Sequence, residues 1–306
     1  MSKIKIGIVG IGYWGKIILK NLESMGKDNI ILCDISFSGK SKYQNYEAVR
    51  DYKQLDCEVI FITTPTSTHF DMCKYFLEKK VRVFCEKPLT TSALEAEALY
   101  ELAFKNHTIL FTNWIFTYNS HIETIKKDYE SGKLGNIRSI FMNRLNLGPE
   151  RFDVNARWDL ASHDISIIQY LFSREPINIK WTDYKRNKNS KQDDSSLGLI
   201  EYDDFIASIN ASWYYRKKVR ECVFEFDNYF IVWDDYKRFL EYEDSANLSF
   251  PIYSGNLTYP CSSYQEPLKN SINAFFSFNN EDLNKQKKLT IETLKILEGY
   301  QDGYNV

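Results

Sequence analysis

The chain has 306 residues, a mass of 36.0 kDa and a formal net charge of −2. At about 150 residues per domain, this length predicts two domains, each large enough for a core of its own. The near-neutral charge provides neither a basic field for nucleic acid nor a polybasic segment for a membrane surface, so we expect neither partner. No stretch approaches the roughly 20 apolar residues that span a bilayer.

The N-terminal run MSKIKIGIVGIGYWG is interrupted by glycines and lacks a small-residue cleavage site, so we do not expect a signal peptide. The cysteines form no CxxC pair, which predicts reduced, mostly buried thiols in a cytoplasmic protein. We predict no metal site, because no HExxH motif, four-cysteine set or carboxylate cluster is present. The six cysteines are Cys33, Cys57, Cys73, Cys85, Cys222 and Cys261.

Over residues 1–117, short apolar runs alternate with helical patterns. Repeated strand–helix–strand units predict an α/β domain with a doubly wound parallel sheet that is covered on both faces. The predicted strands are Lys3–Val9, Asn29–Cys33, Val59–Thr63, Val81–Cys85 and Thr108–Thr112, and the predicted helices are Trp14–Met25, Phe70–Glu78 and Ser92–Lys105.

Residues 118–306 are richer in β-strand patterns. Alternating polar and apolar residues predict an α+β domain built on a largely antiparallel, open sheet with helices on one face. The first expected helix is His121–Ser131, which Gly132 closes. The expected β segments are Ile137–Leu145, Ile177–Lys185, Leu197–Ser212, Glu221–Trp233 and Arg238–Tyr242, with an exposed loop at Lys185–Ser196, helices after Leu268 and a polar run at Asn279–Lys288.

A glycine-rich motif, Gly10-Ile11-Gly12-Tyr13-Trp14-Gly15, follows the first predicted strand and opens the first helix. In this context Gly10 permits the tight turn, Gly12 leaves room for a pyrophosphate, and Gly15 lets the helix pack closely on the strand. The free N–H groups of the helix N-terminus attract the phosphates. The motif therefore predicts a Rossmann dinucleotide site, with Tyr13 and Trp14 beside the cofactor.

Asp34 ends the second predicted strand, 19 positions after Gly15. A carboxylate there accepts hydrogen bonds from the ribose hydroxyls of NAD and repels the 2′-phosphate of NADP. We therefore predict NAD as the cofactor. NADP stays open as an alternative, because four residues that can hold a phosphate follow closely: Ser36, Ser38, Lys40 and Lys42.

Lys87 follows a predicted strand end, where ligands of open α/β sheets bind, and Pro88 stiffens the turn. The triplet Glu86-Lys87-Pro88 resembles a motif of the glucose–fructose oxidoreductase, inositol dehydrogenase and rhizopine-catabolism (Gfo/Idh/MocA) family. Further stretches with this resemblance occur in family order: the glycine-rich turn, Thr63–His69, Ser131–Arg138, Trp158–Asp164 and Glu266–Leu268.

The resemblance implies a Rossmann domain and a second domain whose open sheet often forms an oligomer interface, so we expect a homodimer or homotetramer. It implies that Lys87 contacts the reacting hydroxyl and the nicotinamide ribose, that His163 is the acid/base, and that Asp159 orients the reacting group. Some members use a tyrosine in place of the histidine. The implied cofactor contacts also include Thr64, Pro65, His69 and Glu86.

The chemistry of these residue types agrees with those roles. Asp159 and His163 are four positions apart, so on a regular helix they share one face, where a carboxylate can hold an imidazole in one tautomer. Histidine titrates near neutral pH, which suits proton transfer that accompanies hydride transfer. A lysine ammonium stabilises the developing alkoxide. We interpret His107 and His121 as structural.

Two segments, Asn143–Gly148 and Trp158–His163, are most similar to family members in bacterial surface-polysaccharide synthesis, which act on a ring position of a nucleotide-linked sugar. Such a substrate carries a diphosphate, which arginine and asparagine side chains can bind. The candidates for this contact are Arg144, Arg151, Asn155 and Arg157.

We therefore predict an NAD(P)-dependent oxidoreductase that interconverts a hydroxyl and a ketone on a nucleotide-linked sugar in surface-glycan biosynthesis. One alternative is a free-sugar or inositol dehydrogenase. Another is a protein that binds NAD(H) as a sensor without turnover, although a sensor needs neither Lys87 nor His163.

Overall fold

The structure, a computed structural model, describes residues 4–37, 43, 45–245, 257–258 and 266–299. Its contacts divide the chain into two units. The first comprises Met1–Trp114 and Leu268–Ile291, and the second comprises Ile115–Pro267 and Glu292–Val306. The division at residue 117 stays a prediction about domains, and the contacts group much of the C-terminal tail with the first unit.

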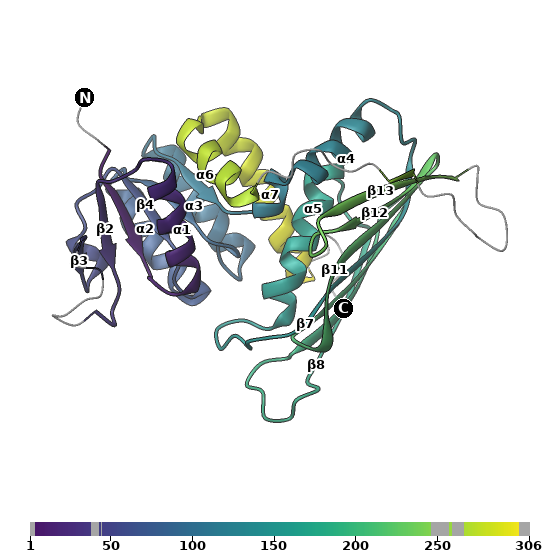
Figure 1. The fold of residues 1–306 in the computed structure, drawn as a ribbon, viewed down its shortest axis with the longest axis horizontal. Coiled ribbons are helices and arrows are strands. Elements are labelled where there is room, and N and C mark those ends of the chain that lie inside the picture. The colour runs from purple at the N-terminus through teal and green to yellow at the C-terminus, as the bar shows by residue number, and fades with distance from the viewer. Residues whose placement is uncertain (1–3, 38–42, 44, 246–256, 259–265, 300–306) are drawn as a thin grey trace. The chain divides into compact units, whose positions relative to one another are not determined.

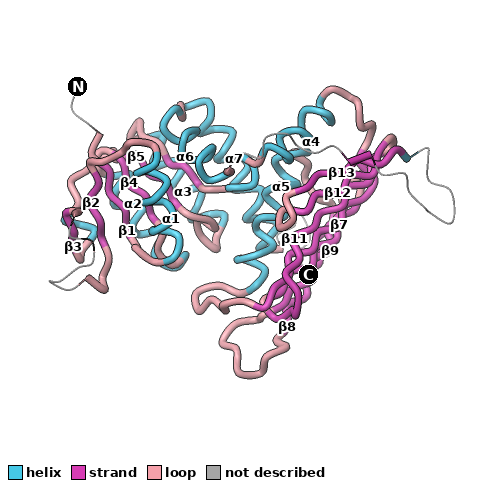
Figure 2. The backbone as a smooth tube through the Cα atoms, in the orientation of Figure 1, coloured by secondary structure: helices cyan, strands magenta, loops and turns pink. Residues whose placement is uncertain are grey.

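Six parallel strands form the sheet of the first unit, in the order β3-β2-β1-β4-β5-β6 (Figures 1 and 2). The strands are β1 (Ile6–Val9), β2 (Ile30–Cys33), β3 (Glu47–Val49), β4 (Val59–Ile62), β5 (Arg82–Cys85) and β6 (Leu110–Thr112). Strand order reverses between β1 and β4, the position at which doubly wound sheets bind their ligands. The predicted Rossmann sheet is confirmed. The short strand β3 escaped prediction, because it is largely exposed and lacks an apolar run.

Helices cover both faces of this sheet, because its strands are apolar on both sides. Three of them connect strands: α1 (Tyr13–Ser24), α2 (His69–Glu78) and α3 (Ala93–Lys105). A fourth, α6 (Pro267–Ser277), comes from the C-terminal tail and places the ring of Phe275 5.5–5.6 Å from three phenylalanine rings. These rings stand in register on β4, β5 and β6 and belong to Phe61, Phe84 and Phe111.

The edge strand β6 is closed by a side chain rather than by another strand. In α7 (Asn280–Glu298), the amide oxygen of Gln286 accepts from Thr112 N at 2.9 Å, and its Nε2 donates to Thr112 O at 3.1 Å. The amide thus imitates a neighbouring strand at this residue and removes exposed edge groups that would otherwise template pairing with another chain.

The second unit contains an eight-stranded sheet in the order β14-β13-β12-β11-β7-β10-β9-β8 (Figure 2). Only β7 and β10 pair in parallel, so the predicted largely antiparallel sheet is confirmed. The strands are β7 (Ile137–Leu147), β8 (Asn178–Tyr184), β9 (Ser195–Glu201), β10 (Ile206–Ser212), β11 (Tyr214–Phe226), β12 (Tyr229–Asp234), β13 (Phe239–Asp244) and β14 (Leu257–Thr258).

One face of this sheet carries the helices α4 (Ser120–Glu130) and α5 (Ser162–Phe172) (Figure 1). Residues on the opposite face remain exposed even where they are apolar. Phe141 on β7 is 49% exposed and Leu199 on β9 is 48% exposed. Alternate residues along each strand point to opposite faces of the sheet, so one set faces the helices and the other set forms an open, partly apolar face.

Two predicted β segments are each two strands. The segment Leu197–Ser212 contains β9 and β10, which reverse between them at residues 202–205. The segment Glu221–Trp233 contains the last part of β11 and most of β12, which reverse at residues 227–228. Both turns contain Asp or Asn, which favour turns. The alternating apolar residues on either side continue the strand pattern, so the sequence did not reveal these turns. The polar run Asn279–Lys288 lies almost wholly inside α7, where its Leu283 and Gln286 are buried and most of its other residues are exposed.

Within the described ranges, no helix is long and apolar enough to cross a membrane. No group of His, Cys, Asp and Glu side chains there could hold a metal ion.

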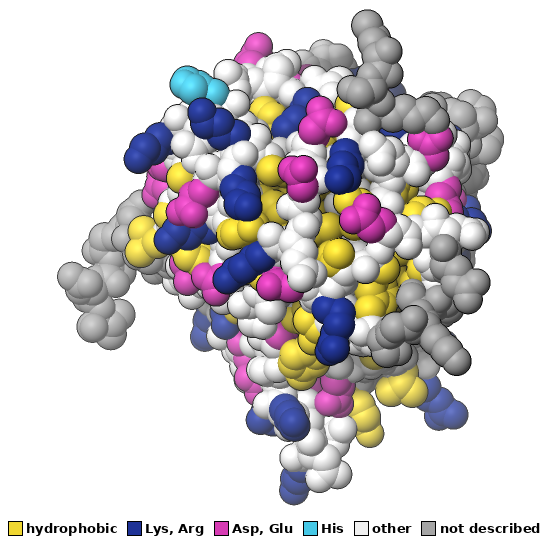
Figure 3. All heavy atoms as spheres, turned by 90° about the vertical axis from the view of Figure 1, so that its left-hand side faces the viewer, with side chains coloured by type: hydrophobic (Ala, Val, Ile, Leu, Met, Phe, Trp, Pro, Cys, Tyr) yellow, Lys and Arg dark blue, Asp and Glu magenta, His cyan; other side chains and the backbone are white. Residues whose placement is uncertain are grey.

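Five cysteines are free and buried as predicted, and Cys261 lies outside the described residues. Acidic and basic side chains are interspersed on the face of the molecule in Figure 3, in keeping with the near-neutral net charge.

Candidate active site

The glycine-rich turn has the geometry that its sequence predicts. Gly10 has a φ of +89°, which residues with a Cβ rarely adopt. A Cβ on Gly15 would lie 2.0 Å from the carbonyl oxygen of Gly10, so only glycine allows α1 to approach β1 so closely. A Cβ on Gly12 would meet no atom within 4 Å. The turn therefore leaves open space above Gly12.

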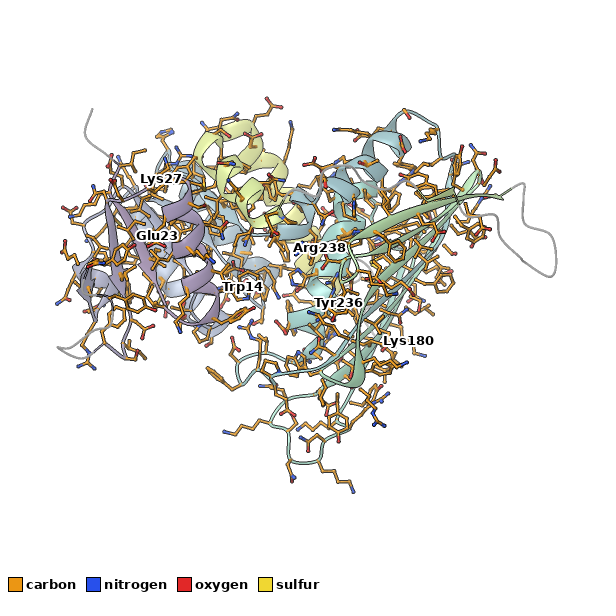
Figure 4. All side chains as sticks on the ribbon, viewed as in Figure 1. Trp14, Glu23, Lys27, Lys180, Tyr236 and Arg238 are labelled. Atoms are coloured by element: carbon orange, nitrogen blue, oxygen red, sulfur yellow. The ribbon has the colours of Figure 1, made fainter. Side chains whose placement is uncertain are left out.

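The first turn of α1 contains no acidic residue, and no side chain caps its N-terminus at Gly12. Its N–H groups and positive dipole end can therefore receive phosphate oxygens. Tyr13 is 76% exposed, and the ring of Trp14, labelled in Figure 4, packs edge-to-face against it at 5.9 Å. The residues present fit the pyrophosphate of a dinucleotide.

Asp34 stands at the end of β2 and holds the glycine-rich turn. Its Oδ2 accepts from Ile11 N at 2.7 Å, and its Oδ1 accepts from the backbone and hydroxyl of Ser36 at 2.9 and 2.6 Å. Burial raises the pKa of Asp34, but these hydrogen bonds outweigh it and hold the pKa below its ordinary value. The carboxylate is therefore ionised at neutral pH. Of the alternative phosphate ligands, Ser38, Lys40 and Lys42 lie outside the described residues.

His69 joins the two loops that carry the other predicted cofactor residues. It begins α2 and is 1% exposed. One ring nitrogen lies 2.9 Å from the carbonyl oxygen of Thr64, and the other lies 2.9 Å from that of Pro88. The ring thus connects the Thr64–Pro65 turn to the Lys87–Pro88 turn, and the predicted contact of His69 with the cofactor stays a prediction.

Lys87 follows β5 and is only 8% exposed. The preceding Glu86 accepts from Lys87 N at 3.3 Å and from Asn113 Nδ2 at 2.8 Å. Asn113 in turn accepts from the hydroxyl of Ser271 at 2.6 Å. This buried chain of hydrogen bonds fixes the backbone at the carboxyl end of the sheet, and with it the base of the lysine side chain.

In the second unit, His163 lies in the first turn of α5 and packs against Phe116. The two rings are perpendicular, with centroids 4.9 Å apart. The guanidinium of Arg144 lies 4.7 Å from the centre of the same phenylalanine ring. Arg144 Nε and Nη2 both donate to Asp164 Oδ1, at 2.9 and 2.7 Å. Phe116 therefore links the candidate acid/base to a buried ion pair.

This geometry speaks against the predicted contact of Arg144 with a substrate diphosphate. Arg144 is 2% exposed and Asp164 is 1% exposed. Burial lowers the pKa of Arg144, but the Asp164 carboxylate more than offsets it, so the pKa lies above its ordinary value. The guanidinium is committed to the protein interior.

Asp159 lies in a π-helical turn, Arg157–Ala161, directly before α5. This wider turn breaks the regular spacing from which we predicted a shared face with His163. Asp159 Oδ2 accepts from Trp213 Nε1 at 3.0 Å, and Oδ1 accepts from Arg151 Nη1 at 3.4 Å. The carboxylate is thus oriented from two sides, and its predicted action on His163 stays a prediction.

The remaining candidate substrate ligands meet carboxylates of their own unit. Arg157 Nη2 lies 2.9 Å from Asp183 Oδ2, to which Asn155 Nδ2 also donates at 3.2 Å. Arg151 binds Asp153 through Nε and Nη2 at 3.0 and 2.8 Å. The structure therefore pairs each of these arginines with an acid, and their diphosphate contacts stay predictions.

Sequence reasoning missed the residues that hold the site from a distance. Asn113, Ser271, Phe116 and Trp213 carry no motif, and their partners stand far away in the chain. Trp213 and Asp159 are 54 positions apart, and Ser271 and Asn113 are 158 apart. The only signal in the sequence was a polar residue at the end of a predicted strand, and such a residue does not indicate which distant residue it contacts.

The sheet topology, the glycine cradle and Asp34 define a protein that binds a nicotinamide dinucleotide through a Rossmann fold. A model described as "Oxidoreductase family, NAD-binding Rossmann fold" matches residues 4–114, and one described as "GFO/IDH/MocA C-terminal domain" matches residues 122–231. The matches cover more than half of the chain. The chain therefore belongs to the Gfo/Idh/MocA family of oxidoreductases, which confirms the resemblance and the prediction of NAD.

Curated relatives differ in the substrates that their names state. Inositol 2-dehydrogenase of Salmonella typhimurium is 27% identical over 191 residues, which are 58% of this chain and 57% of the relative. UDP-N-acetylglucosamine 3-dehydrogenase of Acidithiobacillus ferrooxidans is 23% identical over 186 residues, 59% of this chain and 58% of the relative. The chain spans little more than half the length of these relatives.

Solved structures share the fold over a greater length. A putative oxidoreductase from Magnetospirillum magnetotacticum MS-1 has a TM-score of 0.82 and 19% identity, covering 98% of this chain and 100% of that chain. The WlbA dehydrogenase from Bordetella pertussis, in complex with NADH and UDP-GlcNAcA, has a TM-score of 0.68 and 17% identity, covering 76% of this chain and 78% of that chain. At these identities, the likeness shows the fold alone.

Proposed function

We propose that the protein transfers a hydride between NAD and a ring carbon of a nucleotide-linked sugar, interconverting a hydroxyl and a ketone during synthesis of a surface-glycan sugar. The observation that carries this proposal is Lys87, a buried lysine fixed at the carboxyl end of the dinucleotide-binding sheet. The named activity of the Acidithiobacillus relative and the ligand of the Bordetella neighbour support the nucleotide-linked substrate.

In this proposal NAD, when bound, accepts or supplies the hydride. The turn from Gly10 to Gly15 and the N-terminus of α1 hold the pyrophosphate, and Asp34 accepts hydrogen bonds from the adenosine ribose. Thr64, Pro65 and Glu86 shape the loops at the carboxyl edge of the sheet. These residues orient the dinucleotide and move no proton.

Three side chains handle the proton, the charge and the orientation of the reacting group. His163 takes the proton of the reacting hydroxyl during oxidation and returns it during reduction. The Lys87 ammonium stabilises the negative charge that develops on the oxygen, and its burial strengthens this interaction. Asp159, held by Trp213, orients the reacting group.

The proposal includes a homodimer or homotetramer in the cytoplasm. It is supported by the open face of the eight-stranded sheet, on which Phe141 and Leu199 are half exposed. Sedimentation of the wild type and of Phe141→Lys/Leu199→Lys tests the assembly. We expect the double variant to sediment as a smaller species; equal sedimentation would remove this face from the interface.

The substrate is tested by following NADH absorbance with a panel of UDP-, dTDP- and GDP-sugars, together with free sugars and myo-inositol. We expect turnover with at least one nucleotide-linked sugar at a kcat/KM well above that for the free compounds. Turnover confined to myo-inositol or free sugars would establish the alternative that the inositol dehydrogenase relatives favour. Tight NADH binding without any turnover would favour a sensor.

A further inference from the structure

The strand β11 departs from its pairing with β7 at one place. Tyr214 pairs with Leu147, and the pairing resumes at Val219 with Leu145. Asn146 alone therefore opposes residues 215–218, which form an outward excursion that we call the β11 bulge. Bulges of this kind re-aim side chains and are common beside active sites.

The β11 bulge presents an aromatic ring and three consecutive cations to solvent. Its sequence is Tyr215-Arg216-Lys217-Lys218, and all four residues are exposed. Lys218 Nζ lies 4.8 Å from the ring centre of Tyr236, a residue of the turn between β12 and β13 that Figure 4 labels. Within the part of the chain that the structure describes, the side chains of Arg216 and Lys217 make no ion pair or hydrogen bond.

The base of the β11 bulge is rigid. Arg220 Nη1 donates to Leu145 O at 3.1 Å and to Val219 O at 2.9 Å, and its Nη2 donates to Asn146 Oδ1. Burial and then the nearby charge of Arg144 lower the pKa of Arg220 to about 10, so it remains a cation at neutral pH. The two strands are thus cross-linked where the excursion begins and ends.

The β11 bulge also adjoins the candidate catalytic residues of its unit. Trp213 stands directly before β11 and donates to Asp159 Oδ2 at 3.0 Å. After the bulge, Arg220 is bonded to Leu145 and Asn146 of β7, next to Arg144 in the chain. The cationic segment is therefore held at its start by the π-helical turn and at its end by β7.

We infer that the β11 bulge binds the diphosphate of the nucleotide-linked substrate, an inference that rests on the proposed function. Carboxylates neutralise Arg144, Arg151 and Arg157, whereas no carboxylate among the described residues pairs with Arg216 or Lys217. A diphosphate supplies the anionic oxygens that these cations lack, and arginine can bind such oxygens in a bidentate manner. The exposed ring of Tyr215 offers a stacking face to the adjoining nucleoside or sugar.

The test compares the binding of UDP and of uridine to the NAD-loaded full-length protein by calorimetry. In Arg216→Ala/Lys217→Ala, we expect UDP to bind at least tenfold more weakly while uridine binding stays unchanged. The matched control is Lys180→Ala/Lys288→Ala, which removes two exposed lysines from β8 and α7 and should leave UDP binding unchanged. Arg216→Gln/Lys217→Gln, which keeps polar side chains of similar length, should repeat the loss.

Unchanged UDP binding in both bulge variants, or an equal loss in the control, would overturn the inference. If the bulge variants still bind UDP normally while the wild type turns over UDP-sugars, the inference fails and the proposed function stands. If the wild type binds no UDP and turns over only free compounds, the proposed substrate fails and the inference with it. For a UDP-sugar that is turned over, we expect the bulge variants to raise KM at least tenfold and to change kcat little.

Discussion

The two sheets of this protein place chemistry in different ways. The parallel sheet of the first unit is buried on both faces, and its functional residues stand on loops beyond the carboxyl ends of its strands. The sheet of the second unit is covered on one face, and its polar residues lie between that face and α5. The first arrangement depends on backbone shape, and the second depends on pairs of charges.

This difference teaches where each site is vulnerable. The glycine cradle tolerates no Cβ at Gly15, because the carbonyl of Gly10 would lie 2.0 Å away. The second unit has no such backbone requirement at His163, whose ring is held through Phe116 by the ion pair of Arg144 and Asp164. Substitutions should therefore separate the two kinds of support.

The largest effect is expected where a buried charge loses its partner. Asp164→Asn leaves Arg144 buried without an ionic partner, which should lower the free energy of unfolding by about 3–5 kcal/mol. Urea denaturation measures the loss. Asp204→Asn is the matched control, because the pair between Asp204 and Arg174 is exposed and such pairs contribute about 0–1 kcal/mol. Equal stability of the two variants would contradict a structural role for the buried pair.

The next effect concerns the first unit. Lys87→Ala should reduce kcat by about 10²–10³-fold, the range seen when a group that stabilises developing charge is removed. NADH binding, measured by fluorescence titration, should change little, because the cradle and Asp34 are untouched. Lys74→Ala removes an exposed lysine from α2 and serves as the control. Unimpaired turnover in Lys87→Ala would remove this lysine from the mechanism.

Asp34→Ala tests the ribose contact. Loss of the carboxylate removes its repulsion of a 2′-phosphate, so the preference for NAD over NADP should fall by about tenfold or more. The ratio of kcat/KM for the two cofactors measures this. The ratio is the appropriate readout, because loss of the hydrogen bond from Ile11 N to Asp34 weakens the binding of both cofactors equally and so leaves the ratio unchanged. A constant ratio would show that the ribose assignment is incorrect.

Trp213→Phe tests positioning in the second unit. The variant keeps the buried ring but removes the Nε1–H that orients Asp159, a charge-assisted bond whose loss should lower kcat/KM by about tenfold. We also expect the pH profile of kcat to shift, which a purely structural role would not cause. Trp181→Phe, which removes a donor to Ile296 O, is the control and should leave the profile in place.

The smallest effect is expected on the melting temperature, from a substitution of Asp235, a second aspartate near Arg144. Burial raises the pKa of Asp235, so its ionised form is disfavoured in the folded state despite three nearby cations. Since the folded pKa lies above the unfolded value of 3.8, the penalty is absent below 3.8, grows as the pH rises from 3.8 toward the folded pKa, and is complete above the folded pKa. Asp235→Asn should therefore raise the melting temperature modestly at pH 7 and not at pH 3. A lower melting temperature at pH 7 would contradict this sign.

Much of the first unit could be predicted from sequence, because its signals are local. Gly10, Gly12 and Gly15 lie within six residues, and Asp34 and Lys87 each follow closely after a recognisable strand. The site of the second unit was harder to predict. In the sequence its arginines are plausible substrate ligands, and only the structure shows the carboxylates with which they pair. Arg144 and Asp164 are 20 positions apart and belong to different elements, so their pairing emerges only with the fold.

The amide of Gln286 against the backbone of Thr112 has a consequence for biosynthesis. The first unit cannot finish its sheet edge until the ribosome has translated nearly the whole chain, since the closing side chain lies 174 positions downstream. During that interval the nascent polypeptide has an unprotected β6 and an uncovered row of phenylalanines, both prone to association with neighbouring chains. Removal of both α6 and α7 by proteolysis would return the folded first unit to the same exposed condition, because α6 packs on the phenylalanines and α7 carries Gln286.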